Sequence, residues 1–203
     1  MADEKVCRLL SRREFKELKH TVMESRSIML AMPKNVEIKA AVHDWNRLVE
    51  NAKRLSKSEG ILIMQEDTFF NVSKGRLKLR NLKNEDGGQL IFYNRADMDG
   101  PKLSDYSIYP TGNPDALTKL LSDALGIKGF VKKERWLYMV GQTRVHADLV
   151  EGLGRFVELE VVLREDQSLE EGEAIAQKLM GELGIKKEDL VTGAYMDLLL
   201  ADQ

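Results

Sequence analysis

Polar and apolar residues alternate along several short stretches of the chain, a pattern typical of β-strands with one polar face. In Arg76-Leu77-Lys78-Leu79-Arg80, three cations share one face and two leucines the other, because successive strand side chains point to opposite sides. Asn35, Glu37 and Lys39 alternate with apolar residues in the same way. Strands are predicted at residues 35–40, 61–70, 76–80, 89–95, 131–140, 142–150 and 155–163, with a short one at 106–109 inside a long loop.

Apolar residues spaced three or four apart predict helices between these strands. Each helix begins with a recognisable start signal: Asp44 for the first, Asn113-Pro114 for the second, and the capping box Ser168 and Glu171 for the third. A last short helix is predicted around Tyr195. The residues expected to end the first three helices are glycines: Gly60, Gly126 and Gly184. The apolar stripes of these helices are expected to pack on the apolar faces of the strands.

Residues 1–33 differ in character from the rest of the chain. Ser11-Arg12-Arg13-Glu14 has the form of a capping box, and apolar residues follow at helical spacing among many bases. A basic helix can lie on a membrane or act as a targeting segment, but interspersed acids favour a solvated extension, helical or disordered. We therefore predict an N-terminal extension at 1–33 and a folded domain at 34–203.

Composition excludes several classes of function. The 203 residues carry a formal net charge of -2, so nothing attracts the whole chain to nucleic acid or to an anionic membrane. Cys7 is the single cysteine, which excludes an intrachain disulfide framework. No apolar run approaches the ~20 residues of a membrane span. We expect a cytoplasmic protein, monomeric or homodimeric, with neither nucleic acid nor membrane as a partner.

The polar strand faces carry more cations than acids. If the faces look toward water they are simply solvated; if the sheet closes into a barrel they form a polar interior. Such an interior would hold eight cations and four acids, a surplus of four positive charges with His146 neutral. This surplus requires an anionic partner, and Arg and Lys donors match phosphates well. The acids could bind Mg2+ or Mn2+, or form salt bridges with neighbouring cations.

Several motifs in order resemble those of the CYTH superfamily, the triphosphate tunnel metalloenzymes that include class IV adenylate cyclases and thiamine triphosphatases. Asn35-Val36-Glu37-Ile38-Lys39 is similar to the family's Glu-x-Glu-x-Lys signature. The later motifs resemble the class IV cyclase branch most: Gln65-x-Asp67, Gly75 to Arg80, Tyr93-x-Arg95, Lys133-x-Arg135, and Thr143-Arg144-x-His146-x-Asp148 continuing to Glu158-x-Glu160. The resemblance covers about residues 35–200.

This resemblance implies an α+β fold, an antiparallel closed eight-stranded β-barrel with helices packed outside. It implies that a triphosphate is bound inside: ATP, thiamine triphosphate or tripolyphosphate. Glu37, Glu158 and Glu160 would be ligands of Mg2+ or Mn2+, and Glu37, Lys39 and Glu158 would take part in catalysis. The residues that would bind the phosphates are all basic: Lys39, Arg76, Lys78, Arg80, Arg95, Lys133, Arg135 and Arg144. Asp67 and Asp148 match motif positions without an assigned role, and Asp148 could orient Arg144 or another cation.

Three activities fit this site. Hydrolysis of a triphosphate is preferred, since no nucleobase-reading motif is present; the alternatives are an adenylate cyclase that makes cyclic AMP and pyrophosphate, and a non-catalytic triphosphate or polyphosphate binder. Both reactions stabilise charge on phosphoryl oxygens with positioned cations and a metal. The chain departs from the signature at Asn35, which replaces its first Glu. Replacing Lys78 or Arg135 by Ala is expected to weaken triphosphate binding without unfolding the chain.

Overall fold

The computed structural model describes residues 34–83, 87–95 and 102–201, apart from the side chains of residues 34, 95 and 102–105. The predicted extension at 1–33 lies outside this part of the chain, so that prediction stays open. Among the described residues, no helix is long and apolar enough to cross a membrane.

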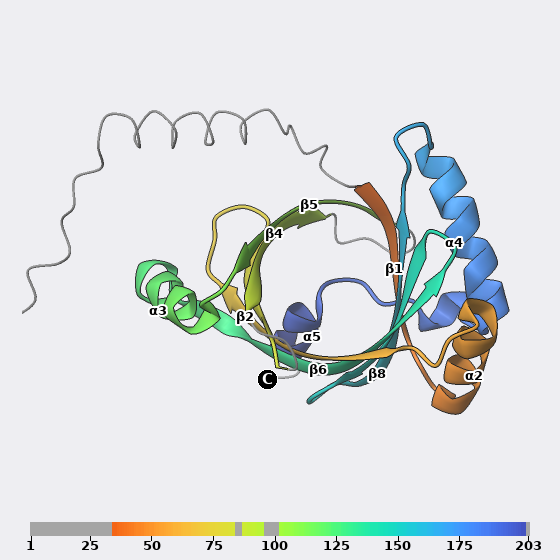
Figure 1. The fold of residues 1–203 in the computed structure, drawn as a ribbon, viewed down its shortest axis with the longest axis horizontal. Coiled ribbons are helices and arrows are strands. Elements are labelled where there is room, and N and C mark those ends of the chain that lie inside the picture. Colours follow the sequence, from red (N-terminus) through yellow and green to blue (C-terminus); the bar gives the residue numbers. More distant parts are fainter. Residues whose placement is uncertain (1–33, 84–86, 96–101, 202–203) are drawn as a thin grey trace, which may run out of the picture. The chain divides into compact units, whose positions relative to one another are not determined.

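Eight antiparallel strands make up the sheet, as predicted. They are β1 (Lys34–Ala41), β2 (Ile61–Phe70), β3 (Arg76–Leu82), β4 (Gly88–Arg95), β5 (Lys102–Thr111), β6 (Ile127–Val140), β7 (Thr143–Val150) and β8 (Gly154–Val162). Their order is β1-β5-β4-β3-β2-β6-β7-β8, and β1 pairs with both β5 and β8. The strands therefore form a ring around a common interior (Figure 1).

Strand β5 corrects the sequence-based prediction of a loop with a short strand at 106–109. It runs for ten residues, Lys102–Thr111, and pairs with β1 on one side and β4 on the other. The surrounding segment, residues 97–113, is rich in Gly, Pro, Asp and Ser, and β5 itself contains Asp105 and Pro110, whose residue types have low strand propensity. Pairing with two neighbours outweighs this propensity, because it satisfies the backbone hydrogen bonds of the segment.

The helices begin and end largely where the sequence indicates. They are α2 (Trp45–Ser56), α3 (Pro114–Leu125), α4 (Leu169–Leu183) and α5 (Tyr195–Ala201), with a short 3-10 helix at Lys187–Asp189. The Ser168 capping box is present, and Gly126 and Gly184 follow α3 and α4. Helix α2 ends earlier than predicted, at Lys57 in a left-handed conformation (φ 54°), so Gly60 is not its cap.

The hydrophobic core lies outside the ring, between the sheet and two of the helices. Leu48 and Ala52 of α2 and Leu179 and Leu183 of α4 pack on the outer faces of β1, β6, β7 and β8. Figure 1 shows α2 and α4 side by side against this part of the barrel. Since helices cover the apolar strand faces there, the opposite polar faces point into the ring.

Helix α5 belongs to a second, smaller apolar cluster. Its first residue, Tyr195, packs edge to face on Phe156 of β8, with ring centroids 5.1 Å apart. Met196 is buried with Phe69 and Val131 in the same cluster. The C-terminal segment thereby brings Tyr195 to the residues that line the barrel interior.

Candidate active site

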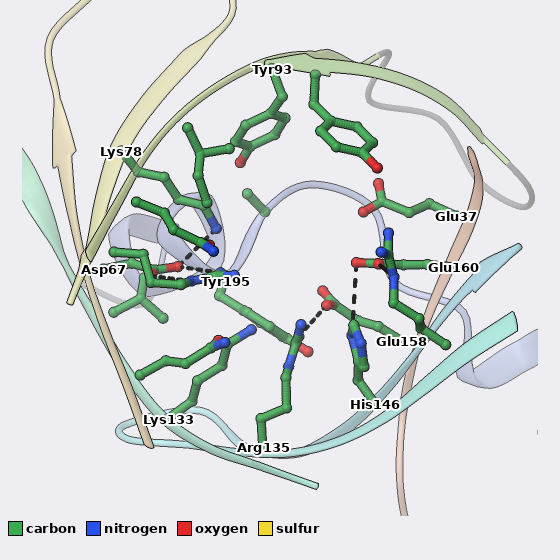
Figure 2. A pocket seen from close by; sticks show the side chains of 18 of the residues that line it. Glu37, Asp67, Lys78, Tyr93, Lys133, Arg135, His146, Glu158, Glu160 and Tyr195 are labelled. Atoms are coloured by element: carbon green, nitrogen blue, oxygen red, sulfur yellow. Dashed lines mark hydrogen bonds and ion pairs between the residues drawn. The ribbon is translucent and has the colours of Figure 1, made fainter. Parts of the chain in front are cut away.

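The barrel interior contains a cavity of about 310 Å³. Figure 2 shows it from close by, with charged side chains from opposite walls pointing toward its centre. Nine of the residues predicted from the sequence line it together: Glu37, Lys39, Lys78, Arg80, Lys133, Arg135, Arg144, Glu158 and Glu160. The structure thus brings most of the predicted site to one place.

Two predicted phosphate-binding residues are not part of this set. Arg76 does not line the cavity, and its guanidinium donates to Asp197 of α5 through Nη2 (2.7 Å) and Nε (3.2 Å). Arg95 is the last residue of β4, and its side chain lies outside the described part of the structure. For Arg76, contact with a phosphate in the cavity would require release from Asp197.

Asp67 positions the two cations of β3 that line the cavity. It lies directly opposite Arg80 in the pairing of β2 with β3. Its carboxylate accepts from Arg80 Nε (2.8 Å) and from Lys78 Nζ (2.8 Å). Burial opposes its charge, but Arg80 and Lys78 together hold the pKa of Asp67 far below its usual range. Asp67 therefore stays ionised and fixes both cations at the wall.

Asp148 of β7 has the same role for the two cations of the neighbouring strand β6. Its carboxylate accepts from Arg135 Nε (2.6 Å), from Lys133 Nζ (3.1 Å) and from the hydroxyl of Tyr195 (2.9 Å). The carboxylate is fully buried, which disfavours its charge, yet Arg135 and Lys133 lower the pKa of Asp148. The sequence motif left this residue without a role, and the structure identifies it as the anchor of the β6 cations.

Glu158 lies between cations of two different strands. Its carboxylate forms an ion pair with Lys39 (3.2 Å) and another with Arg135. Burial works against ionisation, but Lys39 and Arg135 hold the pKa of Glu158 well below its usual range. Lys39 also donates to the carbonyl of Gly193 (3.1 Å) and lies 4.0 Å from the Tyr195 ring centroid. Glu158 is thus an ionised, buried carboxylate in the structure.

Glu160 lies two residues after Glu158 on the same face of β8 and is slightly more exposed to solvent. It accepts from Arg144 Nε (2.7 Å), and its side chain is 15% exposed. In the register of β1 with β8 it lies directly opposite Glu37. Two carboxylates therefore face each other across neighbouring strands, a pair that needs a nearby cation for stability.

His146, Glu158 and Glu160 form a group that fits a divalent cation. One ligand atom from each lies within 4.8 Å of the other two, and the group does not include Glu37. Burial and the charge of Arg135 lower the pKa of His146 well below its usual value, so the imidazole is neutral. Among the described residues its Nδ1 has no hydrogen-bond partner, and an oxygen of Glu160 lies 3.7 Å away. A neutral imidazole with two carboxylates is a donor set that suits Mn2+ and related metals.

Charges inside the barrel are more nearly balanced than the sequence-based count of cations suggested. Among the described residues, six cations face five carboxylates, and most are joined in ion pairs. Two of the predicted surplus of four are accounted for by Asp67, which was not counted, and by Arg76, which binds Asp197; the side chain of Arg95 lies outside the described residues. A triphosphate entering this cavity would add several negative charges, which favours simultaneous binding of a divalent cation.

Sequence reasoning missed Tyr195 and left Asp67 and Asp148 without an assigned role, although it considered Asp148 as a partner of Arg144 or another cation. Asp67 and Asp148 alternate with other inward residues of β2 and β7, so their face was readable although their partners were not. Tyr195 reaches the cavity from α5, and no periodic signal connects that helix to the barrel interior. His146 was placed on the polar face and taken as neutral, but not as a metal ligand.

If the cavity binds a triphosphate, Lys78 is expected to make the affinity pH-dependent. Burial and the neighbouring Arg80 lower the pKa of Lys78 to about 8, so the amine loses its proton as the pH rises through this value. Phosphates attract the protonated form. We expect the affinity for tripolyphosphate to fall by up to about tenfold per pH unit above pH 8, measured by calorimetric titration at pH 7–9.5.

Lys78→Arg is the matched control, because a guanidinium stays charged over this range. The affinity of this variant for tripolyphosphate is expected to change less between pH 7 and 9.5 than that of the parent. Protonation of tripolyphosphate itself affects both proteins equally and cancels when their pH profiles are compared. Identical pH profiles for both proteins would show that Lys78 does not contact the phosphates.

Comparisons with known proteins agree with this geometry. A family model described as the CYTH domain matches residues 33–195. A protein of Methanocaldococcus jannaschii, named as a candidate adenylate cyclase, is 27% identical over 173 residues, which cover 80% of this chain and 97% of that protein.

Solved structures share the fold at low sequence identity. The PH1012 protein of Pyrococcus horikoshii superposes with a TM-score of 0.73 at 23% identity, covering 81% of this chain and 99% of that one. The RNA triphosphatase domain of a mimivirus mRNA capping enzyme has a TM-score of 0.51 at 10% identity, covering 89% and 100%.

Proposed function

The chain belongs to the CYTH domain family, and from this premise we propose that it is a divalent-metal-dependent hydrolase of a triphosphate bound in the barrel cavity. Members of this family are triphosphatases or adenylate cyclases. The observation that carries the proposal is the set of cations from β1, β3, β6 and β7 that surrounds the cavity, each held by a buried carboxylate.

The ion pairs of the cavity suit exchange with a phosphate chain. Asp67 and Asp148 each hold two cations from one side, so that Lys78 and Lys133 keep further N–H donors for a ligand. Lys39 and Arg144 can turn from Glu158 and Glu160 to phosphate oxygens, which would free Glu160 and leave Glu158 paired with Arg135 alone. Ion pairs between side chains of the protein would then be replaced by ion pairs to the substrate, through side-chain rotation and without movement of the backbone.

Glu158 and Glu160, together with His146, would hold the divalent cation. When bound, Mg2+ or Mn2+ would neutralise phosphoryl oxygens and lower the pKa of bound water. The role of Glu37 as a further ligand stays a prediction, supported by its position opposite Glu160. The protein's own part is to align the chain of phosphates and to stabilise charge that develops on its oxygens.

Cyclisation of ATP is the second candidate function, favoured by the name of the M. jannaschii relative. The same cations would then hold the phosphates while the ribose hydroxyl attacks the α-phosphorus. A non-catalytic triphosphate binder would need the cations without the metal group of His146, Glu158 and Glu160.

Incubation with ATP, tripolyphosphate and thiamine triphosphate, each with Mg2+ or Mn2+, tests the proposal. Release of inorganic phosphate is expected. Formation of cyclic AMP and pyrophosphate would show that the protein is a cyclase and not a hydrolase. Tight binding without turnover would show that it is a non-catalytic triphosphate binder. Absence of binding to all three compounds would overturn the proposed function itself.

Asn35 gives a direct test of metal position. It is 3% exposed and lines the cavity, and its Oδ1 is buried without a hydrogen-bond partner. Asn35→Glu adds a carboxylate two residues before Glu37, on the same strand face. We expect Mn2+ to bind about tenfold more tightly, measured by electron paramagnetic resonance titration.

Asn35→Gln is the control for this change, because it lengthens the side chain without adding charge. If Asn35→Glu binds Mn2+ no better than Asn35→Gln, position 35 does not lie at the metal.

A further inference from the structure

One wall of the cavity is chemically unlike the others. It is formed by β4 and β5, and among the described residues no charged side chain lines the cavity there. The lining residues of this wall are polar-neutral, aliphatic or aromatic: Gln89, Ile91, Tyr93, Tyr106 and Ile108. Phosphate oxygens gain nothing from aliphatic side chains, so this wall fits a different part of a ligand.

The residues of this wall form two layers. Tyr93 lies directly opposite Tyr106 in the pairing of β4 with β5, and Ile91 lies directly opposite Ile108. Directly opposed side chains are neighbours on the same sheet face. Figure 2 shows Tyr93 across the cavity from Lys133 and Arg135. A bound molecule can therefore touch cations on one side and this uncharged wall on the other.

Ile108 has no evident task in the folded protein alone. Its side chain is 48% exposed although it lines the cavity, whereas its partner Ile91 is 6% exposed. An isoleucine of the barrel interior that packs incompletely gains from covering by an apolar group of a ligand. Two tyrosine rings beside it offer surfaces on which a flat ring can stack.

Charges around the tyrosines select the kind of ring. Lys78 Nζ lies 5.7 Å from the centroid of the Tyr93 ring. Arg144 lies near the Tyr106 side chain. Both cations are paired with carboxylates, Lys78 with Asp67 and Arg144 with Glu160, so a positively charged ring such as a thiazolium gains no net attraction beside the tyrosines. A neutral ring needs no such attraction.

We propose that the substrate is a triphosphate ester with a flat, neutral ring, as in a nucleoside triphosphate, and that the ring lies against the β4–β5 wall. This inference rests on the proposed function, since it assigns the phosphates to the cations of the same cavity. Inorganic tripolyphosphate leaves the wall uncovered, and thiamine triphosphate places a positive charge there. Both are expected to be poorer ligands than ATP.

Ile108→Ser tests the wall with little risk to the fold, because the side chain is half exposed. Calorimetric titrations in EDTA, where metal-dependent turnover does not occur, compare ATP, tripolyphosphate and thiamine triphosphate. We expect Ile108→Ser to weaken ATP binding by about tenfold and to leave tripolyphosphate affinity within about twofold. Ile108→Phe, which enlarges the apolar wall, is expected to retain ATP affinity.

Tyr109→Ser is the matched control, since Tyr109 is the adjacent residue of β5, is 68% exposed and does not line the cavity. It is expected to bind all three compounds as the parent does. If Ile108→Ser weakens ATP and tripolyphosphate equally, or neither, the ring does not lie on this wall and the inference fails while the proposed function stands. If none of the three compounds binds to the parent, either in EDTA or with Mg2+, both fail.

Discussion

Arg135→Ala is expected to lower the stability of the protein strongly, in contrast to the sequence-based expectation of a purely functional effect. Arg135 is 4% exposed and contacts both Asp148 and Glu158. Its removal leaves two buried carboxylates short of a partner. Breaking a buried pair in this way costs about 3–5 kcal/mol, which corresponds to a fall in Tm of about 6–20 °C for a domain of this size.

Thermal unfolding followed by circular dichroism measures this loss. Lys132→Ala is the matched control, because Lys132 is the neighbouring cation of β6 but faces outward, with a side chain 53% exposed and an ion pair to Glu66. Its effect should stay within about 0.5 kcal/mol. A Tm for Arg135→Ala as high as that of Lys132→Ala would mean that Arg135 does not hold Asp148 and Glu158 in place.

Glu160→Gln is expected to reduce metal-dependent turnover by about 100-fold or more with little change in stability. The carboxylate is a member of the candidate metal group and pairs with Arg144, whose side chain is 32% exposed. Glutamine keeps the size of the side chain, and water can solvate the guanidinium of Arg144 once its carboxylate partner is lost. Steady-state kinetics with Mn2+, together with a Mn2+ titration, separates loss of metal from loss of fold.

Glu158→Gln is expected to affect stability as well as turnover, and therefore separates the two less well than Glu160→Gln. Glu158 is 9% exposed and pairs with both Lys39 and Arg135, so the neutral variant leaves two buried cations short of negative charge. We expect it to lose both turnover and stability. The control for both variants is Glu165→Gln, at an exposed position after β8. Unchanged Mn2+ binding in Glu160→Gln would exclude Glu160 as a metal ligand.

The polar faces of the strands were readable from the sequence because alternation has a period of two. Arg76, Lys78 and Arg80 had to share a face wherever their strand lay, and so did Glu158 and Glu160. Local signals also placed the helices, since capping at Asp44 and Ser168 depends on residues a few positions apart. The family resemblance added the order of these motifs along the chain.

Which acid holds which cation was decided by the tertiary structure. An alternating pattern is unchanged when a strand slips by two residues, so it does not determine the register. The register places Asp67 opposite Arg80 and Asp148 opposite Arg135. Slipping the strands by two residues would place Asp67 opposite Lys78 or Leu82, and Asp148 opposite Lys133 or Leu137, so each acid would lose the direct pairing with its arginine.

The sequence by itself therefore determined the strand faces, most helix boundaries and the residue types of a cationic interior. Only the tertiary structure decided that β5 pairs with β1 and that Arg76 binds Asp197. It also decided that Tyr195 contacts Asp148 in the barrel interior and that His146 lies close to Glu158 and Glu160. The physical reason is distance along the chain. Capping and alternation act over a few residues, whereas these contacts join segments that only the pairing of strands brings together.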